Sequence, residues 1–246
     1  EYGLMQLLAE AYDILKHGAG LSNEALAETF EAWNDGALES FLVEITAAIF
    51  RQPDALSQGS LIDSILDKAK QKGTGKWTSQ NAMDLGIPVP TIDAAVTMRG
   101  LSALKADRAN TAPKYSRSIE QLPLLDKEAL INQMGEALHF AFLMTYAQGM
   151  HLLHEASSAY QFGLNPETIA RYGGAGVSSG QKSSKICGKP ISKSPAWPTS
   201  SILKYSAALC FTDNGLCVRS LVQLINLAIE LRDGHVAGLF IKTVNV

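Results

Sequence analysis

Lysine, threonine and glycine residues gather at positions 71–78, where the sequence reads QKGTGKWT. Glycines let the backbone approach a ligand closely, and lysine charges with threonine hydroxyls suit a phosphorylated or otherwise anionic ligand. The spacing differs from the G-x-x-x-x-G-K-[ST] phosphate-binding loop, and no strand pattern precedes the segment. A solvated basic turn is the alternative, and the segment by itself does not decide between the two.

Arg99 carries a charge on a helical stripe that otherwise faces inward. The spacing i, i+3, i+4, i+7 puts it on the same face as Ile92, Ala95 and Val96. Because burying an unpaired charge is costly, this position suggests a partner such as a phosphate or a carboxylate. The alternative is an arginine whose aliphatic stem lies at the edge of the stripe while the guanidinium reaches solvent.

Two further groups of polar residues are weaker candidates. His151 and His154 lie near Glu155 at helical spacing and suggest a metal site, although paired surface histidines are the commoner arrangement. Asp63 and Asp67 are four residues apart, which is typical of a solvated helix face. We therefore expect no metal site.

The composition bounds the class of protein. The chain has 246 residues, 46% of them hydrophobic, and a net charge of −3, which is typical of one or two soluble domains and gives no indication of nucleic-acid binding. No apolar run reaches the length of a membrane span, and no signal peptide opens the sequence. Three cysteines without a C-x-x-C pair argue against a disulfide framework or a zinc site and favour a reducing compartment. The first residue is Glu, so we expect the chain to begin inside a longer protein.

The elements that must position these residues are predicted to be helices. Apolar residues recur at helical spacing, Ser22 or Asn23 can cap the second helix, and Asp126 can cap a long one. Asn165, Pro166 and Glu167 are typical of another helix start. Within residues 1–171 no alternation typical of strands competes, so we predict an all-α fold with helical stripes over 4–15, 26–33, 38–49, 61–66, 91–110 and 126–158.

The QKGTGKWT segment resembles the signature loop of the decarboxylating 6-phosphogluconate dehydrogenases. Other strings of that family follow in the same order, and order and spacing hold from residue 1 to about residue 171. The chain therefore resembles the C-terminal helical domain of this family. The matching strings are EYGLMQ at 1–6, AWNDG at 32–36, FLVEIT at 41–46, DLGIP at 84–88, RGLSALK at 99–105 and YAQG at 146–149.

The resemblance implies a reaction and a set of site residues. Such enzymes convert 6-phosphogluconate to ribulose 5-phosphate in the pentose phosphate pathway and pass a hydride to NADP. A lysine base removes the hydroxyl proton, and an acid later protonates the enediol that remains after carbon dioxide leaves. Glu1 matches that acid, whereas Tyr2, Lys72, Thr74 and Arg99 match positions that hold the substrate, mostly its phosphate. The lysine base and a nearby His-Asn pair lie just upstream in the family and are missing from this sequence.

The resemblance also implies parts that this sequence lacks. In the family a Rossmann domain precedes the helical domain and binds NADP, yet no strand followed by G-x-G-x-x-G occurs here. Family members dimerise largely through their helical parts, and the tail of one subunit supplies an arginine and a histidine to its neighbour. Neither residue can be identified in this tail. We expect a cytoplasmic homodimer that binds 6-phosphogluconate, with no nucleic-acid or membrane partner.

The composition changes abruptly after residue 171. Residues 172–194 contain five glycines, six serines, four lysines and no acidic residue, which by composition alone is typical of a flexible basic linker. Residues 172–180 can also be encoded by codons that, when they are read one base out of frame, give Ile-Trp-Arg-Gly-Gly-Cys-Ile-Ile-Arg. Members of the family have this string at the corresponding place. We therefore hypothesise a frameshift near codon 171. The predicted domains are a helical domain over 1–171 and a divergent, poorly ordered tail over 172–246.

A second function remains open at this stage. The same helices would serve a catalytically inactive module that only self-associates or binds anions weakly. The distinguishing feature is whether a Rossmann half and a Lys-x-x-His-Asn segment precede Glu1 in the gene.

Overall fold

The computed structural model describes residues 1–115 and 126–169, and within these ranges the chain is built from helices. The extended backbone of the described residues pairs at one isolated antiparallel bridge, between Pro53 and Ser60. The predicted all-α fold is thus confirmed. The predicted divergent tail at 172–246 lies outside the described residues, and the predicted boundary at residue 171 stays a prediction.

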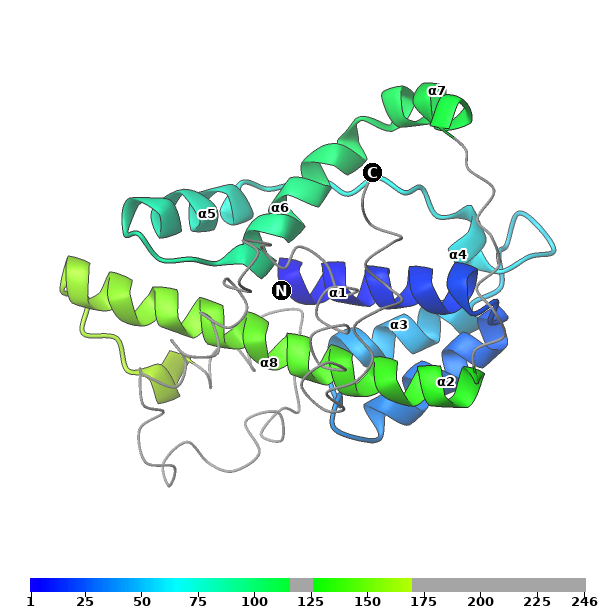
Figure 1. Cartoon of the computed structure of the whole chain (residues 1–246), viewed down its shortest axis with the longest axis horizontal. Helices are drawn as coiled ribbons and strands as arrows, with labels where there is room; N and C mark the ends of the chain where they lie inside the picture. Colours follow the sequence, from blue (N-terminus) through cyan, green and yellow to red (C-terminus); the bar gives the residue numbers. More distant parts are fainter. Residues whose placement is uncertain (116–125, 170–246) are drawn as a thin grey trace, which may run out of the picture.

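The helices follow one another along the chain with short connections, and the ribbon in Figure 1 shows their arrangement. None of the helices within the described ranges is both long and apolar enough to cross a membrane. A final helical turn covers residues 166–169. The helices are α1 (Tyr2–Asp13), the π-helical turn η1 (Ile14–Gly18), α2 (Asn23–Asn34), α3 (Phe41–Arg51), α4 (Leu61–Ser64), α5 (Thr74–Asp84), α6 (Pro90–Ala103), α7 (Lys105–Tyr115) and α8 (Lys127–Tyr160).

Side-chain caps define several of the helix starts. Oxygens of Ser22, Ser40, Asp126 and Asn165 each accept a hydrogen bond from a backbone N–H two or three residues further along, at 3.0 to 3.4 Å. Each bond satisfies a donor that would otherwise lack a partner in the first helical turn. The predicted helix starts after Ser22, Asp126 and Asn165 are confirmed.

The main core lies where α1, α2 and α3 pack against the first half of α8. Figure 1 shows α8 running along the length of the molecule with α1 beside it. The apolar stripes of these helices meet there, because helical spacing brings their large side chains onto one face each. A smaller cluster, formed by Ala82, Val89 and Leu152, joins α5, the segment before α6, and the second half of α8. Fully buried members of the main core include Leu15, Leu26, Phe30, Val43, Met134, Leu138 and Phe142.

Two predicted helices differ from the structure. The helix predicted through residue 66 ends at Ser64, and Ile65 already has an extended ψ of 130°. Ile65 and Leu66 are 50% and 60% exposed, so their helical spacing finds no surface to bury against. Residues 65–73 instead form a segment without a helix, which we name the connector. The helix predicted over 91–110 is interrupted at Leu104, whose ψ of 43° separates α6 from α7.

Candidate functional site

The glycine–lysine segment is mostly the start of a helix. Gly73 has a φ of 95°, in the left-handed region that favours glycine, and it is the N-cap residue of α5. The N–H of Trp77 donates to the Gly73 carbonyl at 3.0 Å, so the helix begins at Thr74. The prediction of a loop over 71–78 is therefore wrong beyond Gly73. A helix start at Thr74 has a chemical consequence, because the first turn of a helix presents unpaired backbone N–H groups that suit an anion.

The Arg99 guanidinium lies over the ring of Tyr2, with its central carbon 3.6 Å from the ring centroid. This is a cation–π contact between α6 and the first turn of α1. Arg99 Nη1 donates to the Lys70 carbonyl at 2.8 Å, and Nη2 donates to Met5 Sδ at 3.3 Å. Arg99 is half-buried, and its contacts within the described residues are a ring, a carbonyl and a sulfur atom. These neutral groups hold the guanidinium in place without neutralising its charge.

Gly75 allows α5 to approach the Tyr2 ring. A Cβ atom on Gly75 would lie 2.7 Å from Tyr2 Cε2, 2.8 Å from Cδ2 and 2.9 Å from Val96 Cγ2, closer than side chains approach one another. The sequence suggested that the glycines of this segment admit a ligand. For Gly75 the structure gives a different reason, because its missing side chain admits Tyr2. The ring is thereby in contact with both the first turn of α5 and the Arg99 guanidinium.

Lys72 and Thr74 lie next to Gln71 and Gly75, two residues that are held beside the Tyr2–Arg99 pair. On one side, Gln71 Nε2 donates to the Val96 carbonyl at 3.3 Å, next to the Lys70 carbonyl that holds Arg99. On the other side, Gly75 packs against the Tyr2 ring. Both Lys72 and Thr74 are exposed. Thr74 is the first residue of α5, so its backbone N–H belongs to the unpaired set.

Glu1 directly precedes Tyr2 and is exposed. The contacts of the described residues join Tyr2 and Arg99 directly and place the other three predicted residues, Glu1, Lys72 and Thr74, on the segments beside them.

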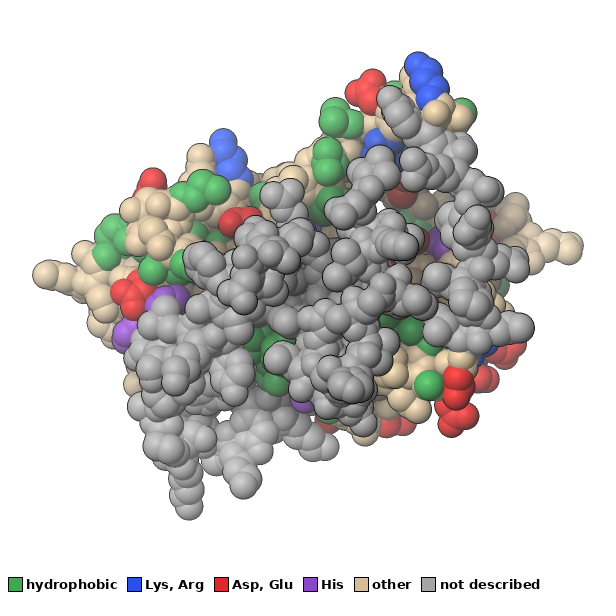
Figure 2. Space-filling view, viewed as in Figure 1, with side chains coloured by type: hydrophobic (Ala, Val, Ile, Leu, Met, Phe, Trp, Pro, Cys, Tyr) green, Lys and Arg blue, Asp and Glu red, His purple; other side chains and the backbone are tan. Residues whose placement is uncertain are grey.

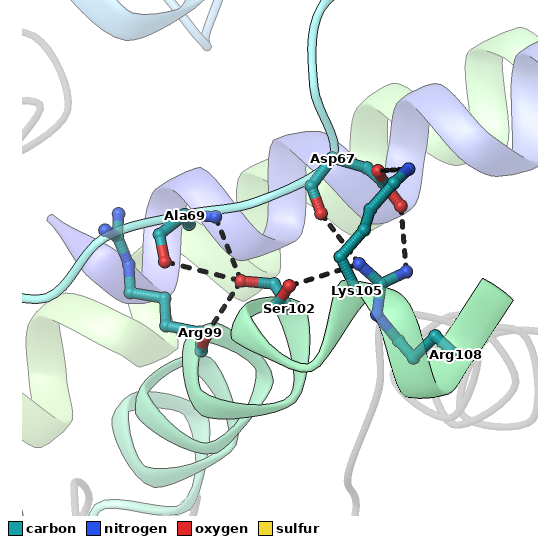
Figure 3. A network of polar contacts seen from close by, with 6 residues as sticks. All are labelled: Asp67, Ala69, Arg99, Ser102, Lys105 and Arg108. Atoms are coloured by element: carbon teal, nitrogen blue, oxygen red, sulfur yellow. Dashed lines mark hydrogen bonds and ion pairs between the residues drawn. The ribbon is translucent and has the colours of Figure 1, made fainter. Parts of the chain in front are cut away.

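A polar network at the other end of the connector was not predicted. Figure 3 shows Asp67 between Lys105 and Arg108, with Ser102 bonded to Ala69 further along the connector. Hydrogen bonds from Lys105 and Arg108 lower the pKa of Asp67 to about 2. The prediction that Asp67 lies on a solvated helix face with Asp63 is wrong, because α4 ends before it. The RGLSALK string, which contains Ser102 and Lys105, was the available signal.

The start of α1 is also supported by α8. Gln148 is 5% exposed, and its side chain accepts from the Thr91 N–H at 3.0 Å and donates to Thr91 Oγ1 at 3.0 Å. A Cβ atom on Gly3 would lie 2.7 Å from Thr145 Cγ2, so α1 approaches α8 closely there. These contacts fix the first turns of α1 and α6 on the same part of α8.

The histidine pair of α8 does not form a metal site with its neighbours in the described ranges. His151 Nδ1 lies 4.0 Å from Glu155 Oε1. Within residues 1–115 and 126–169, no group of three or more His, Cys, Asp or Glu side chains could hold a metal ion.

Comparison with known proteins relates this arrangement to a family. Residues 1–177 match the family model described as 6-phosphogluconate dehydrogenase, C-terminal domain. The chain belongs to this family. The match extends past residue 171 to 177, and those last residues lie outside the described ranges.

Relatives in the 6-phosphogluconate dehydrogenase family come from plants and bacteria. The chain is 47% identical over 177 residues to a chloroplastic decarboxylating enzyme of Arabidopsis thaliana, covering 70% of this chain and 36% of that protein. It is 47% identical over 173 residues to the enzyme of Synechococcus elongatus, covering 70% of this chain and 37% of that protein. The chain thus spans little more than a third of the length of these relatives.

A solved 6-phosphogluconate dehydrogenase of Plasmodium falciparum has a similar fold, with a TM-score of 0.74 and 30% identity. The similarity covers 96% of this chain and 54% of that one. That protein was described in its apo form, with its cofactor NADP+ and with its substrate 6-phosphogluconate.

Proposed function

We propose that this chain forms the substrate-binding part of a decarboxylating 6-phosphogluconate dehydrogenase. The enzyme would convert 6-phospho-D-gluconate to D-ribulose 5-phosphate, carbon dioxide and reduced NADP in the pentose phosphate pathway. The observation that carries the proposal is the Arg99 guanidinium stacked on Tyr2 beside the first turn of α5. A fixed cation next to unpaired backbone N–H groups is suited to a phosphate.

In this proposal the substrate phosphate lies between Arg99, Lys72 and Thr74. A guanidinium has five N–H donors, and the contacts to Lys70 and Met5 use only two of them. The remaining donors can bind phosphate oxygens, the Lys72 ammonium adds a mobile charge, and Thr74 adds a hydroxyl and a backbone N–H. Because neutral groups hold Arg99, little reorganisation is needed when the anion binds.

Glu1 is proposed to protonate the enediol formed after decarboxylation. Glu1 is exposed and directly precedes Tyr2, whose ring contacts the Arg99 guanidinium. The proton-abstracting lysine of the proposed reaction would come from residues outside this sequence.

NADP is proposed to bind to a different part of the enzyme. When bound, it would accept the hydride. The residues at 1–115 and 126–169 do not fit a dinucleotide, because they form no strand that leads through a glycine-rich turn into a helix. The chain's own contribution is therefore to bind and orient the substrate and to donate a proton.

Calorimetric titration of 6-phosphogluconate into the full chain tests the site. We expect Arg99→Ala and Lys72→Ala each to weaken binding about 10- to 150-fold, the effect of losing a hydrogen bond to a charged group. Lys76→Ala is the matched control for Lys72, because Lys76 is an exposed lysine four residues further along, in the first turn of α5. Arg51→Ala is the control for Arg99, because Arg51 pairs with Glu31 on an exposed surface.

Gluconate is the control ligand. It lacks the phosphate, so it should bind much more weakly than 6-phosphogluconate. Equal losses in the control variants would contradict the assignment of Lys72 and Arg99. A folded wild-type chain that binds no 6-phosphogluconate would favour the alternative, a helical module without substrate binding.

We also propose that the chain associates as a homodimer. Apolar side chains of the connector and α6 remain exposed, and Figure 2 shows hydrophobic side chains at the edge of the molecule where Figure 1 places α6. Clustered exposed apolar groups favour an interface. Analytical ultracentrifugation should find a dimer that Leu101→Lys dissociates and that Leu56→Lys, at a 97% exposed turn position, leaves intact. A monomeric wild type would contradict this. The exposed apolar side chains are Ile65, Leu66, Met98, Leu101 and Leu104.

The proposed compartment is the cytoplasm, because three cysteines without a C-x-x-C pair favour a reducing compartment. The names of several plant relatives place those proteins in the chloroplast, which is the alternative compartment. Imaging of the natural full-length protein fused to a fluorescent protein would decide the compartment, and plastid fluorescence would contradict the proposal.

A further inference from the structure

We propose that Ser102 and Asp67 are positioning residues of the anion site. They hold the connector in register along α6, so that Lys72 and Thr74 lie beside Arg99. The expected effect on substrate binding rests on the proposed function, whereas the register of the connector on α6 can be tested without a ligand.

The connector is attached to α6 and α7 by a series of side-chain contacts in antiparallel order. Successive connector residues contact positions that move steadily back along α6, which fixes the register of one segment on the other, and Figure 3 shows the contacts of Asp67 and Ala69 in this series. The next residue after this series is Lys72, and Gly73 then starts α5. The series consists of Asp67 with Lys105 and Arg108, Ala69 with Ser102, Lys70 with Arg99, and Gln71 with Val96.

The Ser102 hydroxyl joins the connector to the backbone of Arg99. Its oxygen accepts a hydrogen bond from the Ala69 N–H at 2.9 Å. Its own O–H donates to the Arg99 carbonyl at 2.8 Å, with the Ala69 carbonyl further away at 3.4 Å. One side chain thus sets the distance between the connector backbone and the residue proposed to bind the phosphate.

Asp67 anchors the beginning of the connector. Arg108 Nη1 donates to the Asp67 carboxylate at 2.8 Å, while Nη2 donates to the Asp67 carbonyl at 2.9 Å and to the Ser102 carbonyl at 3.1 Å. Lys105 donates to the other carboxylate oxygen. Arg108 therefore links the connector to the last turn of α6 as well as to α7. Rigid guanidinium geometry makes such a link directional.

Apolar packing cannot replace these polar contacts. Ile65 and Leu66, the large apolar side chains of the connector, are exposed. Within the connector the backbone makes one bond to itself, from the Lys68 N–H to the Leu66 carbonyl at 2.8 Å, and its end residues Ile65 and Gly73 bond only to the adjoining helices α4 and α5. The polar series is therefore what orders the segment that presents Lys72.

Asp63 provides a matched control for Asp67. Its carboxylate is 52% exposed against 54% for Asp67, and it also contacts basic and amide groups, Lys16 at 3.8 Å and Asn23 at 2.9 Å. It belongs to α4, and these carboxylate partners lie outside the α6 series. A general effect of removing an exposed carboxylate should appear in both Asp63→Asn and Asp67→Asn, whereas a positioning effect should appear only in Asp67→Asn.

The experiment combines hydrogen–deuterium exchange with calorimetry on the full 246-residue chain. Ser102→Ala and Asp67→Asn should raise amide exchange across residues 68–72, leave exchange in α1 and α8 unchanged, and weaken 6-phosphogluconate binding about tenfold. Ser102→Thr, which keeps the hydroxyl, should retain wild-type exchange and affinity. Asp63→Asn should alter neither.

Two results would overturn the inference. The first is unchanged exchange at residues 68–72 in Ser102→Ala and Asp67→Asn. The second is raised exchange with unchanged affinity, which would make the contacts structural only. If the wild-type chain binds no 6-phosphogluconate, the proposed function fails for this chain, and amide exchange alone then tests the register. A local rise in exchange in Ser102→Ala that is absent from Ser102→Thr supports the register. No rise in exchange overturns it.

Discussion

Replacing Gly75 by alanine tests the close approach between α5 and the Tyr2 ring. The new Cβ would lie 2.7 Å from Tyr2 Cε2 and 2.9 Å from Val96 Cγ2, so the ring or the helix must move. Backbone conformation is not the obstacle, because Gly75 lies within α5. The substitution therefore isolates a packing effect at the centre of the candidate site.

Two opposing contributions set the magnitude. Alanine is better than glycine in a helix by up to about 1 kcal/mol, whereas forcing extra volume into a packed site costs about 1–3 kcal/mol. We expect Gly75→Ala to lower the free energy of unfolding by about 0–2 kcal/mol. Gly149→Ala in α8 is the matched control, because no described atom lies within 4 Å of its Cβ position, and it should stabilise the chain by about 0.5–1 kcal/mol.

Urea denaturation followed by circular dichroism measures both variants. Their free energies of unfolding should differ by about 1–3 kcal/mol, and their Tm values by several degrees, since 1 kcal/mol corresponds to about 2–4 °C at this size. Tyr2→Ala should partly rescue Gly75→Ala by removing the ring, and Tyr2→Phe should not, because the ring carbons make the contact. If Gly75→Ala stabilised the chain as much as Gly149→Ala, the close approach would be refuted.

Three other predictions concern the core, the connector and the support from α8. Phe142→Ala should cost about 3–5 kcal/mol of unfolding free energy by urea denaturation, whereas exposed Phe162→Ala should change it by less than about 0.5 kcal/mol, and equal effects would contradict the assigned core. Asp67 has a pKa lowered to about 2, so its ion pairs stabilise the fold above about pH 4 and lose that contribution as the pH falls through 2. A carboxyl titration by NMR with a midpoint near 4 would contradict this. Gln148→Ala should cost about 1–3 kcal/mol by leaving the Thr91 N–H without its acceptor, and a Tm within 1 °C of wild type would argue against that role.

The sequence determined the helical fold and most of the helix starts. Ser22 and Asp126 carry side-chain oxygens that satisfy local N–H donors, and such caps act within a few residues, so their effect is readable from the chain itself. The apolar stripes of α1, α2, α3 and α8 likewise repeat at the helical period. The family strings also named all five candidate residues without a structure.

Only the tertiary structure decided which residues contact one another at the site. The stripe at 61–66 has helical spacing, but α4 ends at Ser64, and Ile65 and Leu66 beyond it remain exposed. Asp67 then meets Arg108, 41 positions further along, which no local pattern could indicate. Gly75 was assigned to ligand access, yet its close neighbour is the Tyr2 ring from the start of the chain. Local hydrogen bonds and periodicity act over a few residues, whereas packing between distant segments depends on the whole fold.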